Sequence, residues 1–205
     1  MISLFRPLVP VTARWRLEDA TGIEHLNLRP SGDTIVADGV IVGDRGGLPY
    51  GVHYRIVCDA GWATTTLLIE TTDGRGLHLA SDGRGAWSDP QGRRRPEFDG
   101  CIDVDLAGSP FTNTLPIRRR ELTPETGAVE FRMLYVPFRT FEPAIDEQRY
   151  RCLAPGLYRY EAVDRSFTAD LTVDEDGLVI DYPTLFHRVL IRNVLAGKHL
   201  HRGVK

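Results

Sequence analysis

Apolar and polar residues alternate with a period of two along most of this chain, and glycine, proline and Asp-Gly steps interrupt the alternation at short intervals. Because alternation places successive side chains on opposite faces of a strand, the pattern predicts many antiparallel β-strands joined by tight turns. A sheet of about a dozen twisted strands does not stay open and flat. We therefore expect an all-β fold, in which one large, strongly curved antiparallel sheet forms a half-barrel or barrel around a cavity. The clearest alternating segments are 12–17, 23–28, 34–42, 50–58 and 62–70.

The turns between these segments are marked by short glycine-containing motifs. The sequence DGRG occurs at 73–76 and again at 82–85, and an Asp-Gly step readily adopts the backbone angles of a hairpin turn. The two copies predict a short strand at 77–80. No helical pattern and no GxxxxGK[ST] motif accompany them, so they do not indicate a phosphate-binding loop. Segment 184–197 fits a short C-terminal helix or a strand, because one helical face is apolar while residues 186–191 alternate.

The whole chain has the composition of one globular domain. No linker divides its 205 residues, so we predict a single domain over residues 1–205, with a core from about 10 to 190 and a frayed tail at 191–205. A net charge of −3 with mixed signs argues against nucleic acid as a partner. The six histidines are scattered and form no ligand motif, so no metal and no cofactor are expected. We expect a monomer or a weak homodimer.

The location of the protein is predicted from what the sequence lacks. No signal peptide or lipidation cysteine is recognisable near the N-terminus, and no apolar run approaches the 18 residues of a membrane-spanning helix. The cysteines Cys58, Cys101 and Cys152 are odd in number and widely spaced, which is typical of free thiols in a reducing compartment. These features predict a cytoplasmic protein without an integral membrane segment.

The stretch CIDVDL at 101–106 combines strand alternation with two carboxylates. In a strand, Asp103 and Asp105 share one face, with their α-carbons roughly 6.5–7 Å apart. The pair can form structural ion pairs with Arg118, Arg119 or Arg132, or it can contact a ligand. Glycosidases also use carboxyl pairs at comparable spacing, so a hydrolase in which Asp103 and Asp105 are catalytic is an alternative.

Polar and aromatic residues beside this stretch allow two interpretations. Thr112 and Asn113 lie in SPFTNTLP at 109–116, where their side chains can close a bent backbone or meet the hydroxyls of a sugar-like ligand. Tyrosine and phenylalanine alternate with arginine between 135 and 160. Such aromatic residues suit a core, and they equally suit the mouth of a wet cavity on which a sugar stacks.

Three strings, FDGCIDVDLAGSPFTNTLPIRR, YVPFRTFEP and DEDGLVIDYPTLFHRV, resemble a bacterial family described as glycolipid-binding, formerly a domain of unknown function. The resemblance covers nearly the whole chain. It implies a half-barrel similar in shape to the lipoprotein carriers of the LolA and LolB type, although those carriers are exported and often lipid-anchored. The matching strings contain the residues that the resemblance nominates for ligand binding: Asp103, Asp105, Thr112, Asn113, Arg118, Arg139, Glu142, Asp181 and Tyr182.

The sequence thus leads to three hypotheses about function. The first is a non-enzymatic protein whose curved sheet holds an amphiphilic small molecule, such as a glycolipid or another lipid, with acyl chains against the apolar concave face. The second is a hydrolase that acts on a sugar or ester bond through Asp103 and Asp105. The third is a scaffold that binds other proteins through exposed sheet edges.

Overall fold

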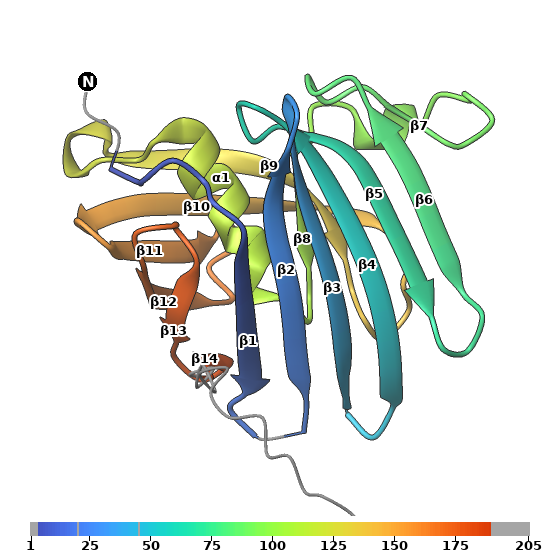
Figure 1. The fold of residues 1–205 in the computed structure, drawn as a ribbon, viewed down its shortest axis with the longest axis horizontal. Helices are drawn as coiled ribbons and strands as arrows, with labels where there is room; N and C mark the ends of the chain where they lie inside the picture. Colours follow the sequence, from blue (N-terminus) through green and yellow to red (C-terminus); the bar gives the residue numbers. More distant parts are fainter. Residues whose placement is uncertain (1–3, 20, 45, 190–205) are drawn as a thin grey trace, which may run out of the picture.

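The computed structural model describes residues 4–19, 21–44 and 46–189, and almost all of its regular structure is one β-sheet (Figure 1). Fourteen strands lie in the order β7-β6-β5-β4-β3-β2-β1-β14-β13-β12-β11-β10-β9-β8. The strands are β1 (Val11–Leu17), β2 (Ile23–Ser31), β3 (Thr34–Asp44), β4 (Pro49–Asp59), β5 (Thr64–Thr71), β6 (Gly76–Ser81), β7 (Trp87–Ser88), β8 (Asp103–Leu106), β9 (Ala128–Val136), β10 (Ala144–Ala154), β11 (Leu157–Ala162), β12 (Thr168–Val173), β13 (Val179–Tyr182) and β14 (Phe186–Arg188). The predicted all-β class and single curved sheet are confirmed.

Each sequence signal for a strand corresponds to a strand in the sheet. Buried and exposed residues alternate along β1 and β2 as expected, and β6 lies between the two DGRG turns. Gly74 and Gly83 have positive φ angles of 86° and 75°, which explains why glycine follows aspartate in both turns. At the C-terminal end, residues 186–188 form β14. The predicted tail at 191–205 and the rest of the ambiguous segment lie outside the described residues.

One pair of strands departs from the expected antiparallel arrangement, because β8 pairs with β9 in parallel. Hairpins join most neighbouring strands and force them to be antiparallel. The connection from β8 to β9 is instead a crossover over residues 107–127, long enough to bring the chain back in the same direction. It contains two 3-10 helices, η2 (Pro110–Asn113) and η3 (Pro124–Thr126), and the helix α1 (Thr114–Arg120). The polar composition of 109–116 predicted a bend but not this helix.

The crossover fills the concave side of the sheet (Figure 1). Phe111, Leu115 and Ile117 are fully buried there, against core residues of the sheet such as Trp15 and Tyr54. The apolar concave face is therefore largely covered by the chain's own side chains.

The sheet rolls up but does not close. Its end strand β8 contacts β5 across the roll, and two backbone hydrogen bonds join this region to the other half of the sheet, from Thr64 N to Ile102 O (3.2 Å) and from Gly100 N to Gly85 O (3.0 Å). As a result, β8 has both faces covered, which explains how a strand with two aspartates can alternate like a buried one.

Candidate functional site

A cavity of about 400 Å³ remains between the crossover and strands β9–β14. A volume of this size lies within the range of small-molecule sites, near its lower end. Polar and apolar groups both contribute to its walls. The lining residues are Asp105, Leu106, Ala107, Ser109, Asn113, Tyr135, Asp146, Tyr160, Ala162, Ser166, Phe167, Tyr182, Leu185 and Phe186.

The sharp bend after β8 positions the polar floor of this cavity. A side chain at Gly108 would place its Cβ 2.4 Å from the ring of Phe138, so only glycine lets the chain pass there. Ser109 then caps η2, its Oγ accepting a hydrogen bond from Phe111 N at 3.2 Å, and Pro110 occupies the first helical position. This bend turns Ser109 and Asn113 toward the cavity beside Asp105.

Two carboxylates of the lining share one amide group. Gln148 on β10 is fully buried, and its Nε2 donates to Asp105 Oδ2 at 2.7 Å and to Asp146 Oδ2 at 2.8 Å. Thr112 Oγ1 donates to the other oxygen of Asp105 at 2.9 Å. Burial raises the pKa of Asp105, the hydrogen bonds from Gln148 and Thr112 oppose this shift, and the charge of Asp146 reinforces it.

A buried tyrosine fixes the orientation of the shared amide. The Tyr150 hydroxyl lies 2.8 Å from Asn113 Oδ1 and 3.2 Å from Gln148 Oε1, and Asn113 Nδ2 donates to Pro110 O at 3.1 Å. Since the amide oxygen of Gln148 faces a hydroxyl donor, its amide nitrogen faces the two acidic side chains. The hydrogen-bond donors that preorganise this polar floor are therefore uncharged in the part of the chain that the structure describes.

Aromatic rings form one wall of the cavity. Tyr160, Phe167 and Tyr182 lie with their ring centroids 6.0–6.3 Å apart in all three pairs, and Phe186 lies 6.1 Å from Tyr182. Burial raises the pKa of the Tyr160 and Tyr182 hydroxyls, and the Asp105 charge adds to the shift. These hydroxyls therefore stay protonated at neutral pH, and the rings offer faces on which a sugar or a cation can stack.

A third carboxyl group, that of Glu24, is buried behind the floor of the cavity. Glu24 on β2 has no solvent exposure, and its Oε1 accepts hydrogen bonds from Ser109 Oγ at 2.7 Å and from the Tyr54 hydroxyl. Its Oε2 is buried and has no hydrogen-bond partner among the described residues. Burial raises the pKa of Glu24 to about 7.

Glycine makes the contact between Tyr54 and Glu24 possible. Tyr54 on β4 is opposite Gly39 on β3, and Glu24 belongs to the next strand, β2. The Tyr54 ring lies across Gly39, where a Cβ would come within 2.3 Å of it. The absence of a side chain at Gly39 therefore lets the tyrosine reach over one strand to the carboxyl group.

The nine residues nominated from the sequence separate into two groups. Asp105, Asn113 and Tyr182 line the cavity, and Thr112 supports Asp105 from behind. The others do not line it.

The two aspartates of β8 have different partners. Asp103 is buried and accepts hydrogen bonds from both Nε and Nη2 of Arg119, at 2.9 Å and 2.6 Å. This is the structural ion pair that the sequence offered as one interpretation. Asp105 has neutral partners instead. Of the two carboxylates in the hydrolase hypothesis, only Asp105 faces the cavity.

The remaining nominated residues have contacts elsewhere on the molecule. Arg118 donates to the carbonyl oxygens of Asp176 and Arg6 at 3.0 Å and 3.2 Å. Its guanidinium group lies over the rings of Phe5 and Trp62. Asp181 forms an ion pair with His187, and Arg139 and Glu142 are exposed.

Sequence reasoning included Tyr160 among the aromatic residues that suit a cavity mouth. It did not find Asp146, Gln148 or the wall residue Phe167. A signal was present for the first two, since polar residues alternate in AIDEQRY at 144–150 and so share one strand face with Tyr150, as Asp103 and Asp105 do on β8. No local pattern could have revealed Glu24, whose partners come from strands far away in sequence.

Neither a metal-binding cluster nor a membrane-spanning helix occurs among the described residues. Within these ranges, no group of three or more His, Cys, Asp or Glu side chains is arranged to hold a metal ion. No helix in the same part of the chain is long and apolar enough to span a membrane. All three cysteines are free and buried.

Comparisons with known proteins place the chain in a family. The family model described as "Putative glycolipid-binding" matches residues 12–188. The structure is similar to the crystal structure of a DUF1089 family protein from Pseudomonas aeruginosa, with 43% sequence identity and a TM-score of 0.71, over 82% of this chain and 92% of that chain. No curated protein matches. The chain belongs to this family, as the resemblance noted in its sequence implied.

Proposed function

We propose that this protein is a non-enzymatic binding protein that holds the polar head group of an amphiphile, such as a glycolipid, in the cavity between the crossover and strands β9–β14. The observation that carries the proposal is the lining itself, which combines preorganised acceptors at Asp105 and Asp146 with the aromatic residues Tyr160, Phe167 and Tyr182. A sugar presents hydroxyl donors at its edge and an apolar face for stacking, so it matches both walls. Membership of the family supports an amphiphilic ligand.

The proposal places the acyl chains outside the cavity. Because η2 and α1 cover the apolar concave face, a cavity of about 400 Å³ is left for the head group. Exposed Ser166 and half-buried Leu185 are part of its lining, and they provide an edge past which a chain can leave.

Blocking the cavity tests this proposal. Ala162 is a buried, cavity-lining residue at the end of β11, so Ala162→Phe places a ring in the space that the head group needs. Octyl glucoside, titrated calorimetrically below its micelle concentration into delipidated protein, is expected to bind saturably with 1:1 stoichiometry. The affinity should fall at least about tenfold in Ala162→Phe, a loss of about 1.4 kcal/mol.

The control places the same ring on the surface. Ala128 is exposed at the start of β9, and Ala128→Phe should bind as the unmodified protein does. If Ala162→Phe does not fold, Ser166→Trp places a bulky side chain at the exposed rim. Absence of saturable binding, or unchanged binding in the blocked variants, would contradict the proposal.

A further inference from the structure

Among the described residues, the lining of the cavity has acidic groups but no basic ones. Asp105 and Asp146 are among its lining residues, and no lysine, arginine or histidine of the described ranges is. The contrast with the neighbouring aspartate of β8 is direct, since Asp103 is neutralised by Arg119, whereas the hydrogen-bond donors to Asp105 are the uncharged groups of Thr112 and Gln148. Within the described part of the chain, the cavity lining therefore supplies no cation to balance the negative charge at its floor.

The carboxylates of Asp105 and Asp146 lie close together, so their mutual repulsion favours a positive group beside them. Each accepts from the same Gln148 nitrogen, at 2.7 Å and 2.8 Å, and one neutral amide cannot compensate two nearby like charges in a partly desolvated site. The negative charge of Asp146 contributes to the raised pKa of Asp105. An anionic head group, such as a phosphate or carboxylate, would add to this repulsion.

The aromatic part of the lining is suited to the same kind of ligand. Aromatic ring faces attract a cation that lies within about 6 Å of their centroids, more strongly where water is excluded. Tyr160, Phe167 and Tyr182 form a continuous aromatic wall of the cavity that contains the two carboxylates. A positive group in this space would lie among aromatic rings and carboxylate oxygens.

We propose that the cavity selects an amphiphile whose head group carries a protonated amine or a quaternary ammonium group, bound between the Asp105–Asp146 pair and the aromatic wall. This inference rests on the proposed function and specifies its ligand class. The two carboxylates supply the charge recognition, and the rings exclude water from the ion pair. An amino sugar and a quaternary ammonium head group both carry the positive charge that this site would bind.

The test compares probes with the same octyl chain and different head-group charge. Octyl 2-amino-2-deoxyglucoside is cationic at pH values below the pKa of its amine, and its N-acetyl derivative is neutral and carries the same ring. Calorimetric titration at about pH 6.5, where a primary amine of this kind is mainly protonated, should show the amine binding at least about tenfold more tightly than the acetamide. Octyltrimethylammonium then distinguishes a requirement for the sugar ring from recognition of the ammonium group alone.

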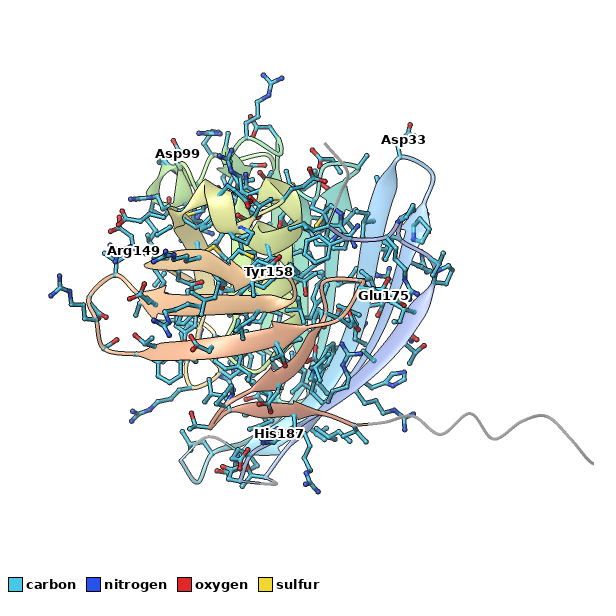
Figure 2. All side chains as sticks on the ribbon, turned by 90° about the vertical axis from the view of Figure 1, so that its left-hand side faces the viewer. Asp33, Asp99, Arg149, Tyr158, Glu175 and His187 are labelled. Atoms are coloured by element: carbon cyan, nitrogen blue, oxygen red, sulfur yellow. The ribbon has the colours of Figure 1, made fainter. Side chains whose placement is uncertain are left out.

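Variants that remove one negative charge test whether Asp105 and Asp146 cause the preference for the amine over the acetamide. Asp105→Asn and Asp146→Asn retain an oxygen that accepts from Gln148. Each should weaken binding of the amine at least about fivefold and change binding of the acetamide less than about twofold. Asp33 provides the control, because it is exposed in the β2–β3 turn. It lies at the opposite end of the molecule from His187 (Figure 2), which follows the lining residue Phe186 in the chain. Asp33→Asn should have no effect on either probe.

The outcomes separate this inference from the proposed function. Equal binding of the amine and the acetamide, abolished by Ala162→Phe, would leave the cavity as the binding site and overturn the selection for a cation. Equal losses for both probes in Asp105→Asn and Asp146→Asn would overturn it too. Binding of no probe at all would refute both proposals. If Asp105→Asn does not fold, Asp146→Asn provides the same test at a half-buried position.

Discussion

Glu24 provides a quantitative test of the electrostatics behind the cavity floor. The residue is fully buried, and its Oε2 has no hydrogen-bond partner among the described residues. A carboxylate in this position cannot be stabilised by water, so the neutral acid is favoured and the pKa rises from 4.5 to about 7. Glu24→Gln keeps the shape of the side chain and its oxygen acceptor for Ser109 and Tyr54 but cannot ionise.

The sign of the pH effect follows from the direction of this shift. Below pH 4.5, Glu24 is protonated in both the folded and the unfolded state and costs nothing. Between pH 4.5 and about 7 the folded protein keeps a proton that the unfolded chain releases, so the free energy of unfolding falls as pH rises. The total loss is about 3 kcal/mol, since each unit of pKa difference corresponds to about 1.4 kcal/mol.

Urea unfolding at a series of pH values measures this loss. The unfolding free energy of the unmodified protein minus that of Glu24→Gln should decrease by about 3 kcal/mol between about pH 4 and 9. The difference isolates Glu24, because all other titrating groups are common to both proteins. Glu142→Gln makes the same substitution at an exposed glutamate and serves as the control. A difference that stays constant within about 1 kcal/mol would refute the reasoning that burial holds Glu24 neutral.

Three further predictions concern the scaffold. Arg119→Ala leaves the buried Asp103 carboxylate unpaired and should lower the free energy of unfolding by about 3 kcal/mol or more. The control, Arg159→Ala, breaks an exposed ion pair and should lower it by less than about 1 kcal/mol. Similar losses for the two variants in urea unfolding would contradict the structural role of the buried pair. Gly39→Ala forces a Cβ within 2.3 Å of the Tyr54 ring and should lower the free energy of unfolding by about 2 kcal/mol or more. Gly76→Ala has ordinary space around the new Cβ and should lower it by less than about 1 kcal/mol. Equal melting temperatures for the two variants would show that the Tyr54 ring moves freely. Burial raises the pKa of all three cysteine thiols. Ellman's reagent should therefore label none of them in native protein at neutral pH and all of them in urea. Rapid labelling of the native protein would contradict their burial.

Much of the fold could be predicted from the sequence because the relevant signals are local. Period-two alternation specifies which residues face inward, and Asp-Gly steps specify hairpin turns, so the meander from β1 to β6 follows directly. The helix α1 was missed because its seven residues are too few to show helical periodicity, and Pro116 lies within them. The parallel pairing of β8 with β9 was missed because it depends on a crossover, which leaves no signal in either strand.

The site could be predicted only in part, for a related reason. The alternation around Asp105 and the turn-forming residues after it identified one side of the cavity. Its other side includes Asp146 of β10, which the sheet order brings close to β8 although no motif in the sequence links the two strands. The charge state of Asp103 likewise depends on Arg119, which the helix places opposite β8. Periodicity and spacing in the sequence cannot predict contacts between residues that only the tertiary structure brings together.

An NMR titration of methyl-labelled protein with octyl 2-amino-2-deoxyglucoside tests the central claim most directly, because it reports where the ligand lies. Binding in the cavity predicts saturable shifts at the methyl groups of Ala107, Ala162 and Leu185, which line it. Val40 and Val42 are exposed apolar residues of β3 and offer the obvious surface for non-specific adsorption, so their signals should stay unchanged. Shifts confined to these valines, or no saturable shifts at the lining residues, would contradict the claim that the head group occupies the cavity.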